Sequence, residues 1–120
     1  MSYLWTTINV NDLEESLKFY QEIVGLPLSS RFQAGPEAEI AFLGDGETKV
    51  ELIAYKGKEA APAGKRISLG FSVPSLEEKI SFLKEKGISM EGEIIAPNPH
   101  SRFFFIMDPN GLRIQFVEQK

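Results

Sequence analysis

Apolar and polar side chains alternate along four short segments of the chain, a period of two that predicts β-strands. One side of each predicted strand carries mainly apolar residues. These are Leu4, Ile8 and Val10; Val50, Leu52 and Ala54; Ile67, Leu69, Phe71 and Val73; and Leu112, Ile114 and Phe116. Apolar faces of this kind need a cover, and we expect two amphipathic helices to supply it.

Two segments have the spacing of an amphipathic helix, with apolar residues at i, i+4 and i+7. The apolar positions are Leu13, Leu17 and Tyr20 in the first segment, and Leu76, Ile80 and Leu83 in the second. Asp12 and Ser75 precede these segments as expected N-caps, and a glutamate three residues later completes a capping box in each. Gly25 and Gly87 stand where each helix needs a left-handed residue to end.

The two halves of the chain repeat one another. Ile8–Glu22 aligns with Phe71–Glu85 at an offset of 63, and Phe42–Leu52 aligns with Ile106–Phe116 at an offset of 64. Each half therefore predicts the order β-α-β-β-β, and Tyr55–Lys65 marks the boundary. We expect an α+β fold and a single domain, 1–120, made of two modules at about 1–57 and 65–120.

Composition and charge exclude several classes of function. The formal net charge is −4 and no basic stretch occurs, which disfavours nucleic-acid binding. The chain has no cysteine, and therefore no disulfide, thiolate nucleophile or cysteine metal ligand. No apolar run approaches the ~20 residues of a membrane span, and the first residues do not resemble a signal peptide. We expect a cytoplasmic protein that is not bound to a membrane.

The second side of each predicted strand mixes large aromatic residues with polar ones. It carries Trp5, Thr7, Ile53 and Tyr55 together with Glu51, Arg66, Ser68, Arg113 and Gln115. A solvated sheet surface and a ligand-binding surface both fit this mixture, and its aromatic content favours the second. Glu51 could pair with Lys49, Arg66 or Arg113, could bind a cationic ligand, or could act as a general base.

The repeat, the segment Val10–Leu28 after the first strand and the closing segment Asp108–Glu118 together resemble the vicinal oxygen chelate superfamily. That superfamily includes glyoxalase I, extradiol dioxygenases and bleomycin-binding proteins. The resemblance covers essentially the whole chain. It implies an open, curled sheet around a cleft, with the helices on the outer face. It also implies pairing of modules and therefore a homodimer.

The metal-dependent members of this superfamily place metal ligands at four strand positions. By resemblance these positions fall on Trp5, Glu51, Ser68 and Gln115. Of these residues only Glu51 is a usual ligand, since divalent metals of this kind favour imidazole and carboxylate groups. We therefore expect no metal site and no cofactor.

Three functions remain open. The first is a metal-free module that binds a small molecule through Trp5, Thr7, Glu51, Tyr55, Ser68, Arg102, Arg113 and Gln115. The second is a glyoxalase I-like lyase or isomerase, or a dioxygenase relative, with Glu51 as the catalytic residue. The third is an interaction surface that no longer binds a ligand. His100, the only histidine, lies in a proline-rich loop and is a minor candidate for acid–base chemistry.

Overall fold

The computed structural model describes residues 1–62, 64 and 66–120 and divides into two compact units, Met1–Pro62 (module 1) and Ala63–Lys120 (module 2). The predicted boundary segment spans the division, and the predicted start of the second module, residue 65, lies outside the described residues. The elements of module 1 are β1 (Trp5–Asn9), α1 (Leu13–Lys18), η1 (Phe19–Val24), β2 (Leu28–Ala34), β3 (Ala38–Leu43) and β4 (Lys49–Tyr55). Those of module 2 are β5 (Ser68–Ser72), α2 (Leu76–Glu85), β6 (Glu91–Asn98), β7 (Ser101–Met107) and β8 (Arg113–Gln119).

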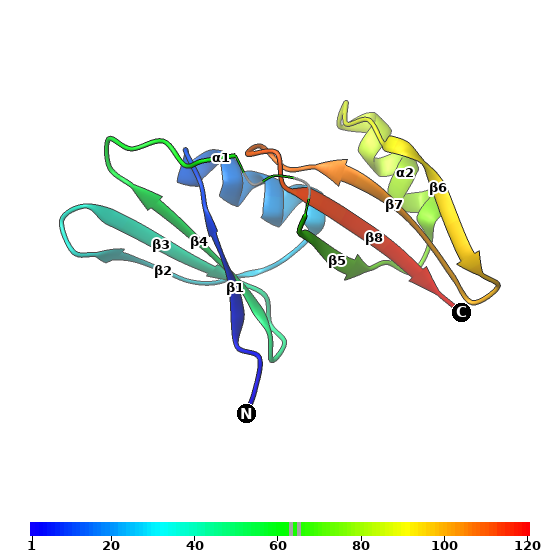
Figure 1. Ribbon diagram of the computed structural model, residues 1–120, viewed down its shortest axis with the longest axis horizontal. Coiled ribbons are helices and arrows are strands. Elements are labelled where there is room, and N and C mark those ends of the chain that lie inside the picture. The colour runs from blue at the N-terminus through cyan, green and yellow to red at the C-terminus, as the bar shows by residue number, and fades with distance from the viewer. Residues whose placement is uncertain (63, 65) are drawn as a thin grey trace. The chain divides into compact units, whose positions relative to one another are not determined.

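Each module forms one four-stranded mixed sheet that remains open (Figure 1). The strand order is β1-β4-β3-β2 in module 1 and β5-β8-β7-β6 in module 2. The first strand of each module runs parallel to the last, and the remaining neighbours are antiparallel. The predicted α+β class and the order β-α-β-β-β are therefore confirmed in both halves.

The helices begin where the sequence predicts. The side chains of Asp12 and Ser75 accept hydrogen bonds from the backbone N–H of Glu15 and Glu78 at 3.2 Å. In module 1 the helix continues as a π-helix, η1, and ends at Gly25, whose φ is 95°. The Gly25 N–H bonds to the carbonyl of Tyr20, five residues earlier, so the wider turn extends to the cap. None of the helices in the described part of the chain is long and apolar enough to cross a membrane.

The predicted apolar faces form the core of each module. Residues of the helix stripes and of β4, β7 and β8 are almost fully buried; they include Leu13, Leu17, Tyr20, Leu52, Leu76, Leu83, Phe104, Ile106, Ile114 and Phe116. Two predicted core positions are wrong: Leu4 and Ile67 are 55% and 61% exposed. Both precede the first residue of their strand, so they lie beyond the sheet that the helix covers.

The repeat holds in the structure with one change of register. Val50 and Ile114 are equivalent, as the offset of 64 predicts, because each pairs with a fully buried apolar residue of the preceding strand. That partner is Leu43 in module 1 and Ile106 in module 2, an offset of 63. The predicted match of Phe42 with Ile106 is therefore wrong, and Phe42 corresponds to Phe105. The reason is that the second hairpin is one residue longer.

Candidate functional site

The sheet of module 1 has a second surface, opposite its apolar face. We call this surface the mixed face; it is made of Trp5, Thr7, Phe32, Phe42, Lys49 and Glu51. Thr7, Glu51 and Phe42 lie side by side on β1, β4 and β3, so Glu51 stands in the centre of the sheet. The hydroxyl of Thr7 donates a hydrogen bond to Oε1 of Glu51. The carboxylate is half-buried and held by a neighbour on the adjacent strand.

Trp5 and Phe42 meet across a strand that separates them. Trp5 is on β1 and Phe42 is on β3, and β4 runs between these strands, which places the two backbones about 10 Å apart. Their ring centroids are nevertheless 5.1 Å apart, edge to face at 75°. Trp5 aligns with Lys49 and Phe42 aligns with Glu51. The two rings therefore close over β4 between these two charged residues.

Phe32 extends this aromatic group onto β2. Its ring lies 6.3 Å from that of Phe42 and is inclined to it by only 21°. Trp5 and Phe32 are each 46% exposed, although rings of this size usually lose most of their surface on folding. No sequence pattern marks Phe32 or Phe42 as a site residue. Phe32 alternates with polar residues along β2, and Phe42 lies in an apolar stretch of β3. Only the strand order places Phe42 beside Glu51 and Phe32 beside Phe42.

Lys49 does not pair with Glu51, although an ion pair between them was one expectation. Its ammonium group instead donates to the carbonyl of Gly46 at 3.0 Å. Among residues 1–62, 64 and 66–120, Glu51 forms no ion pair. The carboxylate of Glu51 therefore carries a charge that its own module leaves without a counter-ion.

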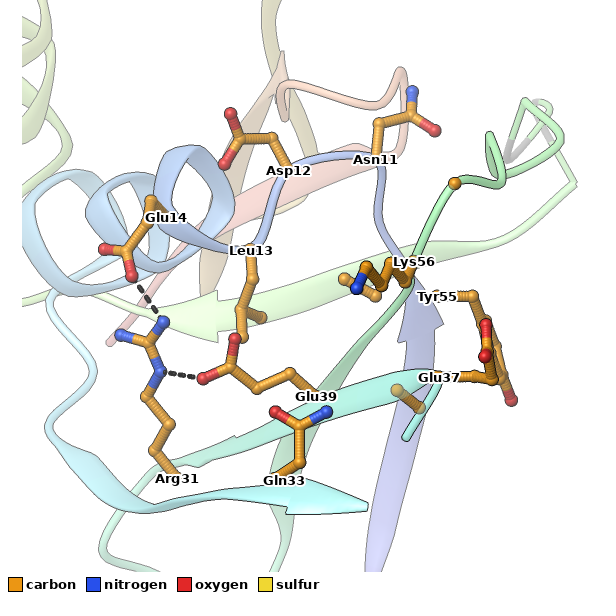
Figure 2. A pocket seen from close by; sticks show the side chains of 13 residues that line it. Asn11, Asp12, Leu13, Glu14, Arg31, Gln33, Glu37, Glu39, Tyr55 and Lys56 are labelled. Carbon is orange, nitrogen blue, oxygen red and sulfur yellow. Dashed lines mark hydrogen bonds and ion pairs between the residues drawn. The ribbon is translucent and has the colours of Figure 1, made fainter. Parts of the chain in front are cut away.

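Tyr55 belongs to a different part of module 1. It is six residues beyond Lys49 on β4, about 20 Å along the strand from the level of Trp5. It lies at the rim of a pocket of about 460 Å³ at the start of α1 (Figure 2). The pocket is lined by Asn11, Asp12, Leu13, Glu14, Arg31, Gln33, Glu37, Ala38, Glu39, Ala54, Tyr55, Lys56 and Gly57.

Ion pairs occupy the wall of this pocket on the α1 side. Figure 2 shows Arg31 between Glu14 of α1 and Glu39 of β3. Arg31 donates to Oε2 of Glu39 at 2.8 Å and also donates to Glu14. These two hydrogen bonds raise the pKa of the Arg31 guanidinium above its ordinary value. The bond to Glu39 has the larger effect. The charges here neutralise one another and attach the first turn of the helix to the sheet.

In module 2 the corresponding surface carries Ser68, Gly70, Arg113, Gln115 and Phe105. Ser68 aligns with Arg113 as Trp5 aligns with Lys49, which confirms the predicted equivalence of Trp5 with Ser68 and of Glu51 with Gln115. Gly70 faces Gln115, and a Cβ on Gly70 would lie 3.1 Å from Oε1 of the amide. The Arg113 guanidinium carbon lies 3.8 Å from the centre of the Phe105 ring, a cation–π contact.

Arg102 lies on the other, helix-covered side of this sheet. It aligns with Glu118 on β8, and the sheet separates it from Gln115. Its guanidinium donates to Glu118 at 2.8 Å and to both oxygens of Glu77 at 3.0 Å. Glu118 also accepts from the N–H of Leu76 at 3.0 Å. The bond from Arg102, and then that from Leu76, holds the pKa of Glu118 below its ordinary value.

His100 lies in the turn between β6 and β7. Its N–H donates to Oδ1 of Asn98 at 2.8 Å, and its carbonyl accepts from the N–H of Lys120 at 2.7 Å. Its imidazole is exposed. The backbone of His100 thus closes the β6–β7 turn through Asn98 and continues the β7–β8 pairing through Lys120.

The side chains at the four metal-ligand positions of the superfamily do not fit a divalent metal. The indole N–H of Trp5 is a donor without a lone pair, and its ring packs against Phe42. Ser68 and Gln115 are neutral, and Glu51 already accepts a hydrogen bond from Thr7. Within the residues that the structure describes, no group of three His, Cys, Asp or Glu side chains could hold a metal ion.

Known proteins match the chain over nearly its full length. Residues 2–116 match the model of the Glyoxalase/Bleomycin resistance protein/Dioxygenase superfamily. The chain is 32% identical to a lactoylglutathione lyase of Haemophilus influenzae, over 100% of this chain and 94% of the relative. It therefore belongs to the glyoxalase/bleomycin resistance protein/dioxygenase superfamily.

Solved structures share the fold. Glyoxalase I of Leishmania major superimposes with a TM-score of 0.85 at 22% identity, covering 98% of this chain and 86% of that one. The antibiotic-binding protein TnmS3 of Streptomyces sp. CB03234 superimposes with a TM-score of 0.78 at 20% identity, covering 100% and 97%. One architecture thus occurs in proteins described as an enzyme and as a binding protein.

Proposed function

We propose that this protein binds a small organic molecule on the mixed face of module 1 and does so without the metal used by metal-dependent members of its superfamily. The observation that carries the proposal is the pair of contacts made by Trp5 and Glu51. Trp5 stands at a metal-ligand position but packs its ring against Phe42, and Glu51 is tethered by Thr7. The position of Trp5 thus offers an apolar surface, and the position of Glu51 offers hydrogen-bond acceptors.

The residues of the mixed face have distinct roles in this proposal. Trp5 and Phe42 supply an apolar surface for stacking, and Glu51 and Thr7 supply a charge and a hydrogen bond. Ser68, Arg113 and Gln115 form a polar surface of module 2, which we propose separately as a surface for small-molecule contacts. Tyr55 and Arg102, which were expected to bind the same ligand, lie elsewhere in their modules, and Arg102 already bonds to Glu77 and Glu118.

Fluorescence tests the binding proposal directly because Trp5 is the only tryptophan. A panel of small aromatic, cationic and anionic compounds is titrated while the emission is recorded. We expect at least one compound to shift or quench the emission saturably, both before and after treatment with EDTA. The proposal fails if no compound changes the emission. It also fails if elemental analysis finds one equivalent of a divalent metal per chain that is lost in Glu51→Gln.

A second candidate function is a lyase of the glyoxalase I type. The favouring observation is the 32% identity with the Haemophilus influenzae lactoylglutathione lyase over the whole chain. In that case Glu51 is the catalytic residue and serves as a general base. An assay of lactoylglutathione lyase activity, with and without added Ni²⁺ or Zn²⁺, tests this candidate. Turnover that disappears in Glu51→Gln would establish it, and absence of turnover under all conditions would remove it.

We also propose that the protein is a cytoplasmic homodimer. Its superfamily pairs modules within and between chains, and a chain without cysteine suits a reducing compartment. Light scattering coupled to size-exclusion chromatography gives the mass in solution. A mass of one chain, 13.4 kDa, at all concentrations would contradict the dimer.

A further inference from the structure

We infer that the mixed face of module 1 selects a ligand that carries a positive charge next to a flat apolar group, such as an aryl-alkyl ammonium ion. This inference rests on the proposed function and narrows the class of ligand. Three features of the face lead to it: a carboxylate without a counter-ion, half-exposed aromatic rings on the same side of the sheet, and a neighbouring lysine whose ammonium group donates to a backbone carbonyl.

The negative charge of Glu51 favours a ligand with a positive charge. Thr7 donates to Oε1, which leaves Oε2 and a further lone pair of Oε1 to accept hydrogen bonds. The carboxylate is half-buried on the sheet. An ammonium group that donates to it forms a charge-assisted hydrogen bond, which is roughly twice as strong as one between neutral groups. An anion at the same place would meet repulsion.

Lys49 is the nearest cation along β4, two residues from Glu51, and it forms no ion pair with the carboxylate. Its Nζ donates to the carbonyl of Gly46. The Trp5 and Phe42 rings close over the strand between the levels of Lys49 and Glu51. The lysine therefore lies on one side of the ring pair, and the carboxylate lies on the other.

The aromatic rings favour both parts of such a ligand. Trp5 and Phe32 each expose 46% of their surface, enough for a flat group to stack or for a cation to lie over a ring. A cation within about 6 Å of an aromatic ring centre gains roughly 0.5–2 kcal/mol, and tryptophan gives the strongest contact. Phe42 is one strand away from Glu51, at about 5 Å, so a linker of one or two carbons can join the ammonium group to the stacked group.

Three probes of similar shape separate charge from shape. Phenethylamine is a cation at pH 7, phenethyl alcohol is neutral, and 3-phenylpropionate is an anion. Each is titrated into ¹⁵N-labelled protein while the single indole N–H resonance, that of Trp5, is followed. We expect the amine to bind about tenfold more tightly than the alcohol, as one charge-assisted hydrogen bond and a cation–π contact predict. We expect the anion to bind most weakly.

Two variants identify the residue that causes the preference for a positively charged ligand. In Glu51→Gln the preference for the amine over the alcohol should fall below about threefold, because the amide removes the charge but keeps the shape. In Lys49→Met the preference should persist or increase. Amide spectra that match the wild type at residues away from the mixed face confirm that both variants fold.

The outcomes distinguish this inference from the function on which it rests. If the alcohol or the carboxylate binds as tightly as the amine, or if the preference survives in Glu51→Gln, the ligand class is wrong while small-molecule binding on this face stands. If none of the three probes moves the Trp5 resonance and the wider fluorescence panel is also silent, both the ligand class and the proposed function are wrong.

Discussion

The hydroxyl of Thr7 donates a hydrogen bond to the carboxylate of Glu51 from the neighbouring strand. The equivalent pair in module 2 is Gly70 and Gln115, where the missing side chain leaves space into which the amide of Gln115 extends. The two modules thus treat equivalent positions differently. Module 1 holds a charged group in place through a side chain, and module 2 makes room for a neutral one.

Thr7→Val should weaken ligand binding without weakening the fold. Valine keeps the shape of threonine but cannot donate to Glu51, so the carboxylate loses its fixed orientation. We expect an affinity loss of about five- to tenfold for the amine probe, which corresponds to the roughly 1 kcal/mol that a typical hydrogen bond contributes. Because Thr7 is exposed, the free energy of unfolding should change by less than about 0.5 kcal/mol. Thr7→Ser, which restores the donor, should recover the affinity, and no recovery would contradict the positioning role.

Gly70→Ala tests the space next to Gln115. The new methyl group would lie 3.1 Å from Oε1, so the amide must move by a few tenths of an ångström. The amide is the far end of a flexible side chain, and alanine reduces the entropy of the unfolded chain. We therefore expect the free energy of unfolding to stay the same or to rise by up to about 1 kcal/mol. A chemical-denaturation curve measures this, and a loss of more than 1 kcal/mol would show that Gln115 is rigidly held.

Adjacent residues of β4 should differ sharply in their contribution to stability. Leu52 is fully buried against the helix side, and Ile53 is only half-buried on the other side. We expect Leu52→Ala to lower the free energy of unfolding by about 2–5 kcal/mol. Ile53→Ala should lower it by about 1 kcal/mol, in proportion to the smaller apolar area that it buries. Urea denaturation of both variants compares them, and equal losses would contradict the assignment of faces.

Gly25→Ala should destabilise module 1 through its backbone. The φ of Gly25 is 95°, where a side chain is strained although no atom lies within 4 Å of the added Cβ. We expect the free energy of unfolding to fall by about 1–2 kcal/mol. Gly46→Ala is a matched control, since that position is equally open and its φ is not in the left-handed region. If both variants lose the same stability, the cause is not the left-handed cap.

Stability should fall in acid through Glu118. The pKa of this carboxyl lies below its ordinary value of 4.5 in the folded protein because Arg102 and the Leu76 N–H donate to the ionised form. The stabilisation is therefore complete above pH 4.5 and is lost as the pH falls toward and through the folded pKa. Glu118→Gln should lower the melting temperature at pH 7 and reduce the further decrease on going to acid. Glu85→Gln, exposed near the end of α2, should behave as the wild type does at both pH values.

The two modules attach their helices with different ion pairs, which no sequence pattern predicts. Glu14 and Glu77 are repeat partners in the first turns of α1 and α2. Glu14 bonds to Arg31 on β2, whereas Glu77 bonds to Arg102 on β7. Arg102 occupies the position that corresponds to Glu39 in module 1, so the arginine and its acidic partner have moved to other strands. Long charged side chains can meet across strands in several ways, and only the assembled sheet selects one.

The sequence by itself determined the repeat, the caps at Asp12 and Ser75 and the apolar face of each module. These features depend on residues close together in the chain and on periods of 2 and 3.6, which local geometry sets. The tertiary structure alone decided that Trp5 meets Phe42, that Thr7 rather than Lys49 bonds to Glu51, and that Tyr55 stands about 20 Å away from Trp5 along the sheet. Such neighbours depend on which strands lie side by side and in what register, and parity along one strand carries no information about either.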